Sequence, residues 1–158
     1  MVDKSSLMVI ADNSGSMGEA AKPFILKDML SFINESLKLG SSLSFSKAEF
    51  YCVNAQIKLL NVNSKDSLDN IKFNEKFNIE EVIKLLKKNS NNIERVLILS
   101  DWKLSMNEKN IFFNFAKKQN MYSIRVVLIE IGLSIDEVNK INSKYFYHPQ
   151  DIQKALNA

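Results

Sequence analysis

The sequence predicts an α/β protein with three layers: a doubly wound, mostly parallel six-stranded sheet, with one antiparallel edge strand and helices on both faces. Short apolar runs, such as residues 7–11 and 96–99, indicate strands buried on both faces, and they alternate with amphipathic helical segments. Such alternation places helices on both faces of a mostly parallel sheet. A two-residue link, Asn54-Ala55, joins two more strand-like runs, so these two must be antiparallel.

The first half of the chain predicts a strand, a helix and a hairpin. Pro23 suits the first turn of the helix, and apolar residues recur at helical spacing after it as far as Leu37. Gly40 is a plausible stop for this helix. The predicted elements of this half are strand 7–11, a helix over 23–40, strands 46–53 and 56–60, and a polar loop over 61–76.

The second half predicts helices that begin at recognisable caps. Asn78, with Glu81 three residues later, and Ser105, with Glu108, both match the capping-box pattern. The predicted elements are a helix after Asn78 that ends at 89–92, strand 93–99, a helix after Ser105, strand 124–131, a helix after Ser134, strand 145–147 and a terminal helix from Pro149.

Composition indicates a single domain over residues 1–158. The chain is 46% hydrophobic and 25% charged, which is typical of a globular protein able to bury a core. No apolar run approaches the roughly 20 residues of a membrane span, and the first residues do not resemble a signal peptide. One cysteine, Cys52, cannot form an internal disulfide, so we expect a cytoplasmic protein. The net charge of +3 comes from interspersed acids and bases, and therefore argues against nucleic acid as a partner.

Polar residues follow the first predicted strand directly. Asp12, Ser14 and Ser16 alternate, so an extended loop would direct all three oxygens to one side. They stand at the carboxyl end of a buried strand, which is where open α/β sheets bind ligands. One carboxylate and two hydroxyls suit a hard divalent cation such as Mg²⁺. A turn with a helix N-cap is the plainer interpretation of the same residues.

The segment Asp12-Asn13-Ser14-Gly15-Ser16 resembles Asp-x-Ser-x-Ser, the first part of the metal-ion-dependent adhesion site (MIDAS) of von Willebrand factor A (vWA) domains. The predicted order of strands and helices is similar to that family over essentially the whole chain. The resemblance implies a further metal ligand, an Asp after the fourth strand, and Asp101 matches it. Two carboxylates at the ends of neighbouring strands would repel each other unless a cation or a proton intervened, and a cation is the natural solution.

One part of the vWA pattern is altered. The family places a Thr ligand just before the third helix, and Phe77, which cannot bind metal, stands in that position. Phe77 has its own explanation as a hydrophobic staple on Val82. Water could fill the missing ligand position, or Asn74, Glu75 or Asn78 could reach it. The resemblance therefore implies a site for Mg²⁺ or Mn²⁺ with weakened or altered binding, or a scaffold of the same fold that binds no metal.

The resemblance also implies a function in protein–protein interaction rather than catalysis. In the family the ion keeps an open position that a Glu or Asp of a partner protein can fill. Met17 and Trp102, beside the predicted site, are candidate contacts for such a partner, and packing on the top of the sheet is the alternative for Trp102. Small vWA proteins of bacteria resemble components of multi-protein systems, so the implied partners include AAA+ ATPases of the MoxR type and stress-system components.

The rival hypothesis is a metal-dependent phosphoryl-transfer enzyme that uses Asp12 and Asp101. Its supporting patterns are weak, since the first strand is followed neither by Asp-x-Asp nor by an acidic pair. The chain has no P-loop, dinucleotide-binding or nucleophile-elbow motif. Its single histidine, His148, lies far in sequence from the acids and serines. The sequence therefore favours a protein that is not an enzyme.

Overall fold

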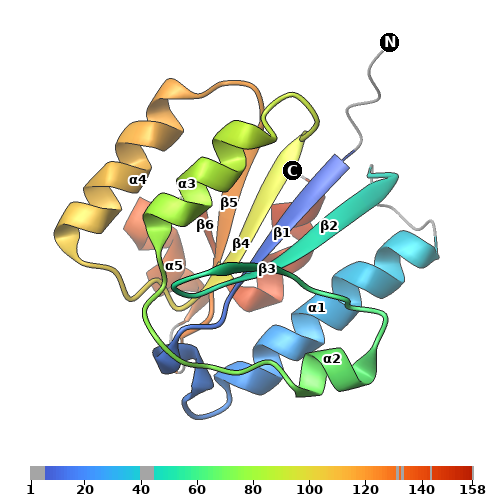
Figure 1. The fold of residues 1–158 in the computed structure, drawn as a ribbon. Helices are drawn as coiled ribbons and strands as arrows, with labels where there is room; N and C mark the ends of the chain where they lie inside the picture. Colours follow the sequence, from blue (N-terminus) through green and yellow to red (C-terminus); the bar gives the residue numbers. More distant parts are fainter. Residues whose placement is uncertain (1–5, 40–44, 131, 133, 143, 158) are drawn as a thin grey trace.

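A six-stranded sheet forms the centre of the molecule (Figure 1). The computed structural model describes residues 6–39, 45–130, 132, 134–142 and 144–157. The strands lie in the order β3-β2-β1-β4-β5-β6, and all neighbours are parallel except β2 and β3. The strands are β1 (Ser6–Asp12), β2 (Lys47–Val53), β3 (Ile57–Leu59), β4 (Arg95–Ser100), β5 (Ser123–Leu128) and β6 (Phe146–Tyr147). This confirms the predicted fold class, including the single antiparallel edge strand.

Helices cover both faces of this sheet, as Figure 1 shows. They are α1 (Lys22–Lys38), α2 (Lys65–Asp69), α3 (Ile79–Lys88), α4 (Met106–Lys118), α5 (Ile135–Asn142) and α6 (Ile152–Asn157). Buried side chains of α1, α2 and α6 belong to one core, and those of α3, α4 and α5 belong to the other. No helix in the described part of the chain is long and apolar enough to cross a bilayer.

Strand β1 shows how the sequence produces the two cores. All seven of its residues are buried. Alternate side chains point to opposite faces of a strand, so Leu7 and Val9 pack with α1 and its neighbours, while Met8 and Ile10 pack with α3 and α4. This placement at the centre of the sheet brings the end of β1 into the middle of its carboxyl edge.

The predicted cap residues begin their helices, with a one-way cap at Asn78 and a full capping box at Ser105. The Asn78 side chain accepts the backbone N–H of Glu81, and Ser105 and Glu108 form a reciprocal capping box at the start of α4. His148 accepts the N–H of Gln150 at the start of the C-terminal helical segment, so it is a cap residue.

Three local predictions need correction. Residues 61–76 are not entirely loop, because Ser64 caps the five-residue helix α2. Residues 15–18 form a 3₁₀ turn, η1 (Gly15–Gly18), rather than an extended loop, because Met17 is drawn into the core. Strand β5 ends at Leu128, short of the predicted limit at Ile131, which lies outside the described residues, as does the predicted helix stop at Gly40.

Candidate functional site

The carboxyl ends of β1 and β4 meet at one edge of the sheet. The two strands are paired in parallel, with Ala11 opposite Leu99, so the polar residues that follow each strand lie next to one another. Three segments surround this position: residues 13–20 after β1, residues 72–77 before α3, and residues 101–105 after β4. Asp12, Ser14, Ser16 and Asp101 all belong to this edge, as the sequence predicts.

Asp12 is fully buried and hydrogen-bonded through both carboxylate oxygens. The backbone N–H of Ser14 donates to Oδ1 over 2.8 Å, and the Ser100 hydroxyl donates to Oδ2. Burial raises the pKa of Asp12 to about 6, against the lowering effect of the hydrogen bonds from Ser100 and Ser14. The carboxylate is therefore already held by neutral donors of its own chain.

Ser100 is a site residue that the sequence analysis missed. Its hydroxyl donates to Asp12 and also accepts the backbone N–H of Trp102 over 2.9 Å. Ser100 is completely buried, and it therefore links the end of β1 to the loop that follows β4. The available signal was a hydroxyl residue at the end of a buried apolar strand, immediately before Asp101.

The two serines of the predicted metal motif face each other. Their hydroxyl oxygens are 3.4 Å apart, and Ser14 is buried while Ser16 is half-buried. The η1 turn, closed by a bond from the Met17 N–H to the Ser14 carbonyl, sets this arrangement. The hydroxyls therefore gather on one side, although not through the extended loop that alternation predicted.

Asp101 has a partner that sequence reasoning did not identify. The Lys22 ammonium lies 3.1 Å from its Oδ2, and both residues are buried, with exposed fractions of 4% and 5%. The same ammonium donates to the backbone carbonyl of Ser16 over 3.4 Å. The remaining oxygen, Oδ1, accepts the Lys103 N–H over 3.4 Å. A cation supplied by α1 therefore already compensates this carboxylate.

Phe77 and Trp102 belong to the aromatic core beneath the edge. Phe77 is 4% exposed and lies in the same core as Val82, as expected for a hydrophobic staple. Its ring centroid is 6.5 Å from that of Trp102, and Trp102 packs edge-on against Phe112 at 4.9 Å and Phe146 at 5.8 Å. The position of the family's Thr ligand is thus filled by apolar packing.

Direct partner contact by Met17 and Trp102 required exposed side chains, and the structure buries both. Met17 is fully buried, with its sulfur 3.3 Å from the Asp101 backbone nitrogen, and Trp102 is only 7% exposed. Trp102 has a left-handed backbone conformation, with φ of +58°, and its ring lies in the core. In this conformation neither side chain offers a surface to a partner.

Two of the three alternative ligands near Phe77 have side-chain oxygens that are already bonded elsewhere. The Asn78 side-chain oxygen accepts the Glu81 N–H, and the Asn74 side-chain oxygen accepts the Asn54 amide. Glu75 is exposed, and its backbone carbonyl accepts the Gly15 N–H.

The residues present do not fit a divalent cation in this arrangement. A positive charge, Lys22, contacts Asp101, and Phe77 brings no ligand oxygen. In the described part of the chain, no group of three or more His, Cys, Asp or Glu side chains could hold a metal, so a site at this edge would depend on the hydroxyls of Ser14 and Ser16. What the arrangement does provide is a buried polar cluster, closed by its own cation, beneath three loops.

Comparisons with known proteins identify the fold. No family model matches the chain, and no curated protein matches it in sequence. Among solved structures, it is similar to a von Willebrand factor type A protein from Catenulispora acidiphila, at 12% identity and a TM-score of 0.57 over 98% of this chain and 41% of that one. It is also similar to the manganese-loaded TRAP protein of Plasmodium vivax, at 16% identity and a TM-score of 0.62 over 96% and 71% of the two chains.

A third similar structure is proximal thread matrix protein 1 from the mussel byssus, described with a zinc-occupied MIDAS motif. It is 10% identical, with a TM-score of 0.57 over 99% of this chain and 46% of that one. The chain thus spans less than half the length of the first and third of these proteins. At such low identity the likeness concerns the fold, and on that basis the chain has a von Willebrand factor A-like fold.

Proposed function

We propose that this chain is a protein-interaction domain whose contact surface is the carboxyl edge of the sheet, formed by residues 13–20, 72–77 and 101–105. The observation that carries the proposal is the location of backbone strain. Among the described residues, the non-glycine residues with positive φ are Ala20, Glu75 and Trp102, and one lies in each of the three loops. Such conformations cost about 1–3 kcal/mol each and persist chiefly at functional sites.

Two of these three loops, residues 13–20 and residues 72–77, are hydrogen-bonded to each other. The Gly15 N–H donates to the Glu75 carbonyl over 2.9 Å, and the Asn74 N–H donates to the Asn13 carbonyl over 3.1 Å. The Asn13 side chain adds a bond to the Lys72 carbonyl. A surface ordered before binding loses little conformational entropy when a partner arrives, which suits recognition.

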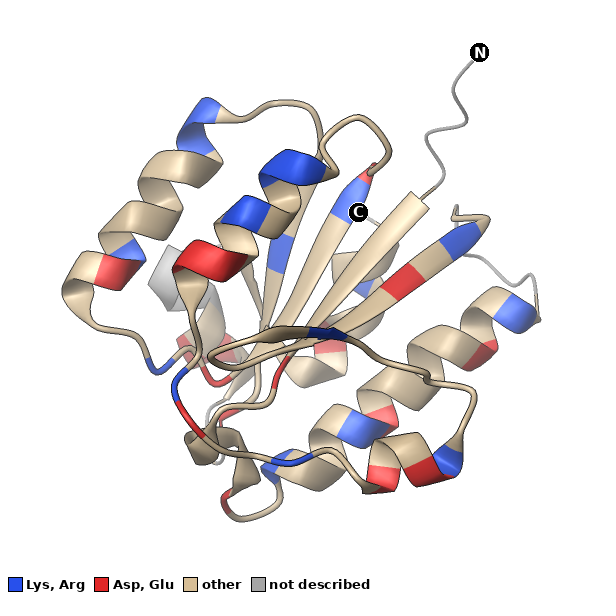
Figure 2. Cartoon of the chain, viewed as in Figure 1, with Lys and Arg blue, Asp and Glu red and all other residues tan. Residues whose placement is uncertain are grey.

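The vWA-like fold supports the same function, since the family uses this edge for recognition. The resemblance implies that the partner is another protein. We propose an AAA+ ATPase or a component of a cytoplasmic stress system as that partner. Charge gives no support to a nucleic acid, because Lys and Arg are interspersed with Asp and Glu along the chain (Figure 2).

The metal-bridged form of recognition, with Mg²⁺ or Mn²⁺ and an acidic residue of the partner, needs a rearrangement. Lys22 would have to leave Asp101 before that carboxylate could serve a metal. We therefore propose the interaction surface without a bridging ion.

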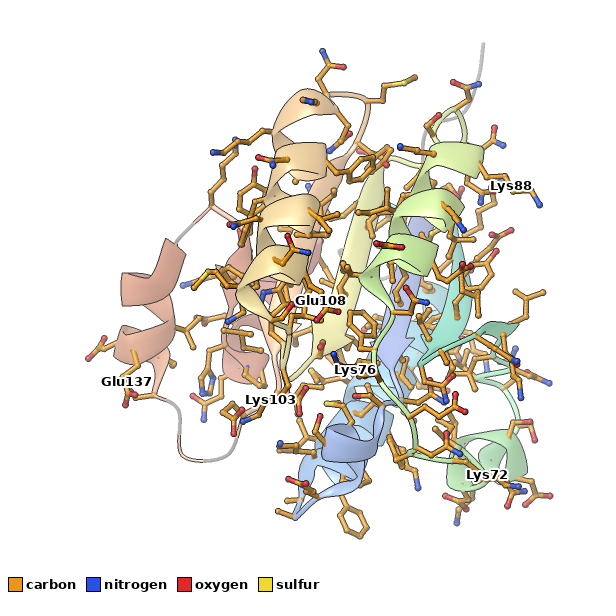
Figure 3. The ribbon with its side chains drawn as sticks, turned by 60° about the vertical axis from the view of Figure 1, so that its left-hand side comes forward. Lys72, Lys76, Lys88, Lys103, Glu108 and Glu137 are labelled. Carbon is orange, nitrogen blue, oxygen red and sulfur yellow. The ribbon has the colours of Figure 1, made fainter. Side chains whose placement is uncertain are left out.

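The proposal is tested by reversing charge at this edge and at the opposite end. In Figure 3, Lys76 and Lys103 lie below the middle of the view and Lys88 lies in its upper part. All three are exposed. Lys76 pairs with Glu108 and Lys103 with Glu130, but ion pairs of exposed lysines contribute little to stability, so replacement perturbs the fold little. The test variant is Lys76→Glu/Lys103→Glu, and the matched control is Lys87→Glu/Lys88→Glu at the end of α3.

Each variant is used to purify partners from the source cells, with and without chelator. We expect a protein that co-purifies with the wild type and the control to be lost with the edge variant, and chelator to leave the wild-type complex intact. Equal recovery with both variants would place the contact elsewhere and refute the proposed surface.

Catalysis by Asp12 and Asp101 is the weaker alternative. A nucleophile must reach its substrate, yet Asp12 is fully buried and Asp101 is paired with Lys22. We expect no turnover of a generic phosphate ester with Mg²⁺ or Mn²⁺ above that of Asp12→Asn. Metal-dependent turnover abolished by that substitution would establish the enzyme instead.

A further inference from the structure

The unexpected feature of this edge is a buried lysine. Lys22 is the first residue of α1, next to Pro23, and its side chain is 5% exposed. Lysine is almost never buried without a partner, because removing an ammonium from water is costly unless charge and hydrogen bonds compensate it. The burial of Lys22 therefore requires a specific acceptor set, and this edge supplies one.

The acceptor set consists of Asp101 and a backbone carbonyl. The ammonium lies 3.1 Å from Asp101 Oδ2 and 3.4 Å from the Ser16 carbonyl oxygen. Both acceptors belong to the segments that the sequence predicts to surround a metal ion. Lys22 lies 6 residues after Ser16 and 79 residues before Asp101, so its ammonium connects the two segments.

Charge explains why a cation is needed here. Asp12 is the last residue of β1 and Asp101 follows the adjacent strand β4, and two carboxylates in such proximity destabilise each other. Asp12 is held by neutral donors, the Ser14 N–H and the Ser100 hydroxyl. Asp101 is the carboxylate that pairs with a full positive charge. With Lys22 in place, the cluster has a compensating cation that belongs to the chain itself.

We propose that the Lys22 ammonium supplies the positive charge that a divalent cation supplies in a metal-dependent site, so that this edge is complete without metal and excludes Mg²⁺ and Mn²⁺. A divalent ion bound by Asp101 and the serines would meet the ammonium at close range and be repelled by it. Phe77 provides no ligand oxygen where the family has a Thr. Lys22 already pairs with a second ligand oxygen, Oδ2 of Asp101. The inference deepens the proposed function, since it makes recognition at this edge independent of metal.

The test uses the purified chain and Mn²⁺ alone, with binding followed by electron paramagnetic resonance of the free ion. The variants are Lys22→Met, which removes the charge but keeps an unbranched side chain, and Lys38→Met as a control that removes an exposed lysine from the same helix. The double variant Lys22→Met/Asp101→Asn tests whether any gained site uses the released carboxylate.

We expect the wild type and Lys38→Met to show no saturable binding at millimolar Mn²⁺. Lys22→Met should bind Mn²⁺ at least about tenfold more tightly than the wild type does. The double variant Lys22→Met/Asp101→Asn should lose that gain. Wild-type binding as tight as that of Lys22→Met would overturn the inference, and so would a folded Lys22→Met variant without any gain.

If Lys22→Met does not fold, Lys22→Gln replaces it with the same expected gain, because it removes the charge but keeps a donor for the Ser16 carbonyl, and the wild type is also examined. Its thermal midpoint should be the same in chelator and in millimolar Mn²⁺, whereas a rise with Mn²⁺ would show a resident metal site. No partner enters this experiment, so its failure leaves the proposed interaction surface standing, and the failure of that proposal leaves this one standing.

Discussion

Removing either charge of the Lys22–Asp101 pair should destabilise the fold strongly, and removing both should not. In Lys22→Met the Asp101 carboxylate stays in place with its side chain 0% exposed and no cation beside it. In Asp101→Asn the ammonium is left without its charged acceptor. Breaking a buried ion pair from one side costs about 3–5 kcal/mol.

The double variant Lys22→Met/Asp101→Asn leaves two neutral side chains of similar size. Replacing both members of a buried pair often costs little, so we expect about 0–2 kcal/mol rather than the sum of the single effects. The coupling free energy should then be at least about 4 kcal/mol. The exposed pair Glu35–Lys38 on the same helix is the control, and its disruption should cost less than about 1 kcal/mol.

The assay is urea unfolding in the presence of chelator, followed by tryptophan fluorescence. Trp102 is the only tryptophan and is buried at this edge, so its emission reports the loss of the site's structure directly. Single effects that simply add, or a cost below about 1 kcal/mol for Lys22→Met, would refute the view that the pair is a buried and mutually dependent unit.

Three further substitutions test other parts of the structure. Trp102→Ala should cost about 3–5 kcal/mol by thermal unfolding, because it empties an aromatic core, and a loss below about 1 kcal/mol would contradict that packing. Gly18→Ala places a Cβ 2.8 Å from the Cβ of Phe73 and should cost about 1–3 kcal/mol; Phe73→Gly should relieve it and Phe73→Ala should not, since the clash is with the Cβ and not the ring. The backbone N–H of Ser105 lowers the pKa of Glu108, so the stability that the carboxylate adds is complete above its ordinary value of 4.5 and is lost as pH falls through the lower folded-state pKa. Glu108→Gln keeps an acceptor oxygen for the cap but does not titrate, so its free energy of unfolding should vary less with pH over that acid range. An unchanged pH dependence would contradict the role of the carboxylate in the cap.

Local patterns were sufficient to predict most of the fold. The apolar runs of β1 and β4 are buried on both faces, so their composition alone identifies central parallel strands. The caps at Asn78 and Ser105 are short-range bonds between residues three apart, and sequence spacing specifies them. The short helix α2 was not predicted, because a helix of five residues is too short to show a hydrophobic periodicity.

The site was predicted only in part, because its chemistry depends on contacts between distant segments. A lysine in the first turn of an amphipathic helix ordinarily faces water, and only the meeting of α1 with the end of β4 turns Lys22 inward. The burial of Trp102 depends on a positive φ that no sequence pattern predicts for tryptophan. The acids and serines themselves were found because they follow directly on a buried strand.

The backbone pairing between residues 13–15 and 74–75 has a kinetic consequence. Because these loops are bonded to each other before any partner arrives, association would require neither loop closure nor folding. The rate constant would then be set by collision and orientation, at about 10⁵–10⁷ M⁻¹s⁻¹ for docking two preformed patches. Differences in affinity among variants of the exposed edge residues would accordingly lie in how long each complex persists.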